Sequence, residues 1–92
     1  MNTFDVKKTV EEVKKQTARD IIRELHKMIC EFTREKDFIF NNYMGDNMSL
    51  EVYQHRADWL SGSIDSLEDA IENIEDMYEV GPRYVLADSN LE

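Results

Sequence analysis

The chain has little glycine, proline or cysteine, and it has no long apolar run. Its 92 residues include three glycines, one proline and one cysteine. A sheet protein needs turn residues roughly every 8–12 positions, so this scarcity excludes a sheet and predicts an all-α fold. The single cysteine, Cys30, cannot form a disulfide within the chain, which suits a reducing compartment. No stretch reaches the roughly 18 apolar residues of a membrane span, and residues 1–15 lack a signal-peptide core. We therefore expect a soluble intracellular protein.

Basic residues are also scarce. The chain has 11 Lys and Arg against 20 Asp and Glu, which is a formal net charge of −9. A direct ligand of nucleic acid needs Lys and Arg to displace phosphate counterions, and an anionic membrane surface attracts the same residues. The composition argues against both ligands and favours a basic protein partner or simple solubility.

Two long helical patterns account for most of the chain. In each of them apolar residues recur every three or four positions, as in helices that bury one face. An Asn-, Gly- and Asp-rich segment separates them, Asn47 or Ser49 can cap the second, and Gly81-Pro82 ends it. We predict one domain, residues 1–92, built as an antiparallel hairpin of long helices. Its predicted elements are a helix at about 4–38, a connection at 41–48, a helix at about 49–80 and a tail at 83–92.

The second helix carries the most unusual pattern in the sequence. Between Ala57 and Pro82 there are eight acidic residues and no Lys, Arg or His. At about 100° per residue, the acids from Asp65 to Glu79 fall within roughly 120° of arc, away from the apolar seam. Like charges one turn apart repel by a few tenths of a kcal/mol per pair, so such a face costs stability. This acidic face consists of Asp58, Asp65, Glu68, Asp69, Glu72, Glu75, Asp76 and Glu79.

Two interpretations of the acidic face stay open. In the first it is a solvated surface, partly neutralised by basic residues near the start of the antiparallel first helix, such as Lys7, Lys8, Lys14, Lys15 and Arg19. In the second it imitates DNA, which presents one negative charge per about 1.7 Å of axis. Carboxylates one helical turn apart lie about 5–6 Å from each other, close enough to phosphate spacing to meet side chains that bind a DNA backbone.

Both helices have more apolar surface than one mutual contact uses. A core between two helices is thin, and an apolar stripe that contains a tryptophan is typical of an interface. We therefore expect two copies to pair into a four-helix assembly. The predicted dimer interface, called the shoulder below, consists of Val52, Trp59, Ser63, Ala70 and Met77 on the second helix, with Ile22 and Ile29 on the first.

No arrangement of residues indicates catalysis. Carboxylates one turn apart, such as Asp65 and Asp69, resemble the metal ligands of helical phosphohydrolases, but those enzymes direct carboxylates from several helices into a core. Cys30, one turn after His26, would need a base and an orienting group to act as a nucleophile, and a partly buried structural cysteine is the better interpretation. We predict a protein that is not an enzyme, with no catalytic residue, metal or cofactor.

The sequence as a whole resembles a phage protein family. The opening MNTFDVKKTVEEVKKQTARD, the run HRADWLSGSIDSLEDAIENIEDMYEV and the length are similar to the Arn (anti-restriction nuclease) proteins of T-even bacteriophages. The resemblance implies a small dimeric DNA mimic in the host cytoplasm that competitively blocks the DNA-binding surface of the host McrBC modification-dependent restriction endonuclease. It supplies no motif for individual residues, so helix geometry alone assigns the acidic face. The alternative is an acidic homodimeric adaptor without DNA mimicry, which binds through the shoulder.

Overall fold

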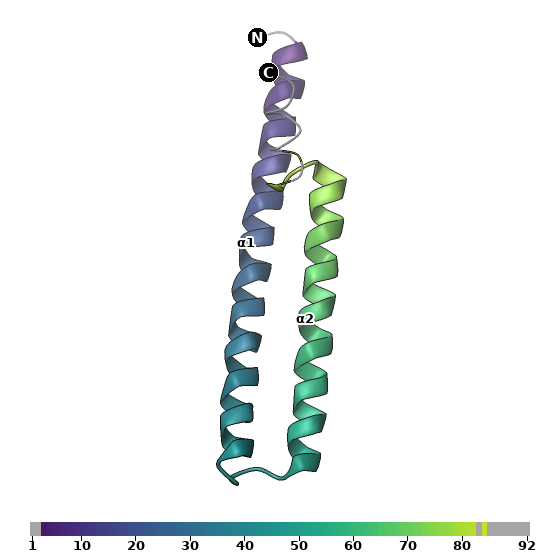
Figure 1. Ribbon diagram of the computed structural model, residues 1–92. Helices are drawn as coiled ribbons and strands as arrows, with labels where there is room; N and C mark the ends of the chain where they lie inside the picture. Colours follow the sequence, from purple (N-terminus) through teal and green to yellow (C-terminus); the bar gives the residue numbers. More distant parts are fainter. Residues whose placement is uncertain (1–2, 83, 85–92) are drawn as a thin grey trace. The chain divides into compact units, whose positions relative to one another are not determined.

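The computed structural model describes residues 3–82 and 84, and these residues form two long helices (Figure 1). Helix α1 spans Thr3–Met44, and helix α2 spans Leu50–Tyr78. No strand occurs among the described residues, which confirms the all-α class. The predicted tail at 83–92 lies outside the described residues apart from Tyr84. Neither helix contains a described stretch that is long and apolar enough to cross a membrane.

Helix α1 continues beyond the predicted end near residue 38 and reaches Met44. The extra turns bury Ile39 completely, and they bring Tyr43 onto Tyr53 of α2, with ring centroids 4.8 Å apart and the rings nearly parallel. The connection is therefore shorter than predicted. Of the two possible caps, Ser49 is the one used for α2, because its Oγ accepts the backbone N–H of Val52 at 3.3 Å.

The end of α1 is a Schellman motif without glycine at the left-handed position. The N–H of Asn47 donates to the carbonyl of Asn42 at 2.9 Å, and the N–H of Asp46 donates to the carbonyl of Tyr43 at 3.1 Å. Asp46 has a φ of 62°, a conformation that Asp tolerates better than most residues. Gly45, the glycine of the connection, stands one position earlier.

Helix α2 ends in the same way, with its left-handed residue two positions before Gly81. Glu79 has a φ of 54°, and the N–H of Val80 donates to the carbonyl of Glu75 at 3.0 Å. The buried side chain of Val80 supplies the apolar contact that accompanies this motif. The helix therefore stops at Tyr78, and Glu79 of the acidic face belongs to the cap rather than to the helix.

Replacing Glu79 with glycine is expected to stabilise the protein. A residue with a side chain in the left-handed conformation costs about 1–2 kcal/mol, which glycine avoids. Glycine also has more conformational freedom in the unfolded chain, and this offsets about 0.5–1 kcal/mol of the stabilisation. The net increase of about 0.5–1 kcal/mol should raise the melting temperature by a few degrees, measured by circular dichroism.

Gly81→Ala is the matched control and should change stability in the opposite direction. Gly81 has a φ of 109°, and a Cβ there would collide with the side chain of Glu75. If Glu79→Gly lowers the melting temperature, the left-handed cap at Glu79 is not a source of strain.

The contacts within the chain define two units, and each combines a part of α1 with a part of α2. Unit 1 comprises residues 1–24 and 71–92, and unit 2 comprises residues 25–70. Unit 2 is an antiparallel helical hairpin, visible in Figure 1 as the teal and green segments on either side of the connection. Its core includes the buried Ile39 and Leu60. Unit 1 buries Ala18, Ile71 and Val80.

Candidate partner-binding surface

The acidic face follows α2 through both units. Unit 2 holds its first four residues, from Asp58 to Asp69, and unit 1 holds the last four, from Glu72 to Glu79. All of them are exposed except Glu75, which is half-buried. The carboxylate of Glu75 is folded over Gly81, so this residue presents less charge to the outside than its helical position predicted.

Direct ion pairs between the acidic face and basic residues are scarce in the part of the chain that the structure describes. Within the described residues, seven of the eight carboxylates of this face form no ion pair. The remaining one, Asp76, accepts a hydrogen bond from the hydroxyl of Tyr84 at 3.3 Å. Lys14, Lys15 and Glu79 line one hollow of unit 1, yet no ion pair joins Glu79 to either lysine. The first interpretation, a solvated surface that α1 partly neutralises, therefore gains no support from direct ion pairs at these seven residues, and both interpretations remain predictions.

The charges at the end of α2 work against helix stability. The C-terminal end of a helix carries a partial negative charge, and an acid there costs about 0.3–1 kcal/mol. The last turn of α2 contains no basic residue, although Glu75, Asp76 and Glu79 lie at or beside it. The chain therefore retains carboxylates at positions where lysine or arginine would stabilise the helix.

The shoulder residues differ in exposure. Trp59 is 62% exposed and Met77 71%, and Val52 is also exposed. The other four predicted interface residues are half-buried within a single chain. On α1, Ile21 and Met28 are more exposed than the predicted Ile22 and Ile29. The part of the shoulder that is open to a partner is therefore narrower than the sequence pattern suggested. The half-buried residues are Ser63, Ala70, Ile22 and Ile29.

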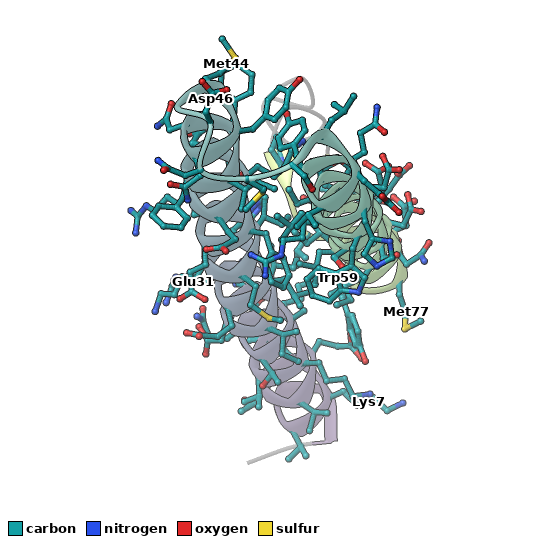
Figure 2. All side chains as sticks on the ribbon, turned by 90° about the horizontal axis from the view of Figure 1, so that it is seen from below. Lys7, Glu31, Met44, Asp46, Trp59 and Met77 are labelled. Atoms are coloured by element: carbon teal, nitrogen blue, oxygen red, sulfur yellow. The ribbon has the colours of Figure 1, made fainter. Side chains whose placement is uncertain are left out.

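Trp59 lines two open hollows of unit 2, and Figure 2 labels its side chain on α2. Its ring packs edge to face on Phe32, with 5.8 Å between the ring centroids. The hollow on one side is lined by Glu35, His55, Arg56, Trp59 and Leu60. The hollow on the other side is lined by Phe32, Asp58, Trp59, Gly62, Ser63, Ser66 and Leu67.

Sequence reasoning assigned Asp58 and Trp59 to two separate surfaces. In the structure they line one hollow. Neighbouring residues on a helix point about 100° apart, and this angle is small enough for both side chains to border the same depression. The adjacent positions of Asp58 and Trp59 in the sequence were therefore a signal that they could share a surface. The hollow also needs Phe32 from α1, and no local pattern predicts that contact.

The cysteine differs from its predicted environment. Cys30 is exposed and free, so the interpretation of a partly buried structural cysteine was wrong. Its helical position places it on the outer side of α1, next to Ile29, which takes the inner position. No group of three or more His, Cys, Asp or Glu side chains among the described residues is arranged to hold a metal ion.

Comparison with protein-family models, with curated proteins and with solved structures finds no match to this chain. Its function therefore has to follow from the chemistry of the acidic face and of the surface around Trp59.

Proposed function

We propose that this protein is a phage anti-restriction protein that acts as a DNA mimic. Its acidic face would occupy the DNA-binding surface of the host McrBC restriction endonuclease and exclude DNA by competition. The observation that carries the proposal is a row of exposed carboxylates on α2, among them Asp65, Glu68 and Glu72, that form no ion pair with any basic residue the structure describes. The resemblance to the Arn proteins suggests the target.

The spacing of the carboxylates along α2 supports mimicry of a DNA strand. Six acids lie between Asp65 and Asp76, which are 11 residues apart. At a rise of 1.5 Å per residue this is about 16 Å of axis, or one carboxylate per roughly 3.3 Å. One strand of B-DNA carries one phosphate per about 3.4 Å. A track of Lys and Arg that binds a phosphate backbone therefore meets charges at a similar linear density.

The proposal predicts strong salt dependence of inhibition. The protein is titrated against McrBC bound to a fluorescent DNA duplex that contains modified cytosine, and displacement is followed by anisotropy. Because both surfaces are charged, raising the salt from about 50 to about 200 mM should weaken binding of the mimic on the order of tenfold or more. An affinity that is the same at both salt concentrations would contradict the mechanism.

A basic DNA-binding protein of unrelated fold serves as the control for specificity. Displacement of DNA from McrBC but not from the control protein is the expected result. Displacement of DNA from both proteins would mean that the protein acts as a general polyanion without specificity for McrBC. No displacement of DNA from McrBC would refute the proposed function.

The second candidate is the homodimeric adaptor, and the exposure of Trp59 and Met77 favours it. Large apolar side chains that are open to solvent at helical spacing are typical of an interface. If the protein is a dimer, light scattering should give a molar mass twice that of one chain. Trp59→Ala should then shift the equilibrium towards the monomer. A wild-type protein that stays monomeric at high micromolar concentration would exclude the shoulder as a dimer interface.

A further inference from the structure

The hollow that contains Asp58 and Trp59 combines a negative charge with a flat aromatic surface. It is a shallow depression open to solvent rather than an enclosed cavity, so a side chain of a partner protein can reach it. Its lining includes one carboxylate, the hydroxyls of Ser63 and Ser66 and the ring of Trp59, but no Lys, Arg or His. A Cβ added at Gly62 would meet no atom within 4 Å, so this side of the hollow is open to an approaching chain.

We propose that this hollow binds an arginine side chain of the protein whose DNA-binding surface is blocked. The proposal rests on the DNA-mimic function. The guanidinium group would stack on the indole of Trp59 and form an ion pair with Asp58, while the serine hydroxyls accept its remaining N–H groups. Together Asp58 and Trp59 then offer what a nucleotide offers to an arginine, a negative charge beside a flat π-surface.

Arginine fits this lining better than lysine. Its guanidinium is planar and weakly hydrated, so it stacks on an aromatic face and can donate two parallel hydrogen bonds to a carboxylate. Lysine is a strongly hydrated point charge, and it would use Asp58 while gaining less from Trp59. Cation–π attraction is strongest at tryptophan.

A second copy of the chain is a poorer occupant of this hollow on grounds of charge. Helix α2 carries eight Asp and Glu against a single Arg, Arg56. Two α2 helices that meet at Trp59 would bring their Asp58 carboxylates and the neighbouring acids together, and like charges at an interface are costly. A cationic partner avoids this repulsion.

The test compares two labelled peptides of equal charge, hexa-arginine and hexa-lysine. Binding is measured by fluorescence anisotropy, and Trp59, the sole tryptophan, reports on its own surroundings by its emission. The wild-type protein should bind hexa-arginine about three- to tenfold more tightly than hexa-lysine, with a change in tryptophan emission that hexa-lysine does not produce.

Three variants separate stacking from charge. Trp59→Leu should bring the arginine-to-lysine ratio close to one, whereas Asp58→Asn should weaken both peptides and lower the ratio only in part, because stacking on Trp59 remains. Asp69→Asn is the matched control: it removes the same charge from an exposed position about 16 Å further along the helix. It should weaken both peptides equally and leave the ratio unchanged. Circular dichroism verifies that each variant is folded.

Several outcomes overturn the proposal. The first is equal affinity of the wild-type protein for both peptides, and the second is an unchanged arginine-to-lysine ratio in Trp59→Leu. The third is a wild-type dimer that Trp59→Leu converts to a monomer, because this would assign the hollow to a second copy of the chain. The McrBC displacement assay distinguishes failure of the arginine site from failure of the proposed DNA-mimic function. If Trp59→Leu inhibits as well as the wild type, the mimic stands without the arginine site. If the wild type does not displace DNA, the mimic itself is refuted.

Discussion

Reversing the charge of Glu68 and Glu72 together is expected to weaken inhibition of McrBC about 100-fold. Both residues are exposed, they lie one turn apart on α2, and neither has an ion pair among the described residues. A lysine at each position would face the Lys and Arg side chains of a DNA-binding surface, and juxtaposed like charges at an interface cost several kcal/mol. The measurement is the half-maximal concentration for displacement of DNA, at constant salt.

Glu31→Lys with Glu24→Lys is the control for this pair. These glutamates are also exposed, but they belong to α1, and Figure 2 shows Glu31 on the side of α1 that faces away from α2. Glu24 is two helical turns from Glu31 and so shares its side of α1. Both double variants change the net charge by the same amount. Equal losses of inhibition in the two would mean that overall charge, and not the acidic face, determines binding.

Replacing Ile39 with alanine is expected to have the largest effect on folding. Ile39 is the only described side chain with no exposure at all, and it lies in the core of unit 2. Truncating a buried isoleucine costs about 2–5 kcal/mol, whereas a whole domain is stable by only about 5–15 kcal/mol. Few other side chains are buried, so little of the core remains to compensate. Urea unfolding followed by circular dichroism gives the change in the free energy of unfolding.

Ile21→Ala is the control for this substitution. Ile21 lies in the same helix but is 46% exposed, so the same chemical change should cost about 1 kcal/mol or less. If the two variants were equally destabilised, the burial of Ile39 in the hairpin would not be the source of its contribution.

The acidic face illustrates a conflict between stability and the proposed function. Carboxylates at the C-terminal end of α2 oppose the helix dipole, and Glu79 occupies a backbone conformation that glycine adopts more readily. Glu79→Gly should therefore raise stability and remove one charge of the mimic. Proteins commonly retain such unfavourable features where binding requires them.

The sequence by itself determined the features that depend on local periodicity. Apolar spacing by threes and fours identified two helices, and Ser49 was recognised as a possible cap because its hydroxyl needs only the next turn of backbone. The acidic face followed in the same way, since residues three and four apart share one side of any helix. These properties require no knowledge of what the helix packs against.

The tertiary structure decided which apolar residues lie inside and where each helix ends. Ile22 and Ile29 alternate with Ile21 and Met28 around α1, and only the position of α2 selects the first pair for burial. The left-handed residues Asp46 and Glu79 end the helices although glycines stand nearby, because the packing of the residues that follow determines which position must reverse the chain. The hollow at Asp58 and Trp59 likewise exists only because α1 places Phe32 against the indole ring. Contacts of this kind join residues far apart in the sequence, and local patterns do not encode them.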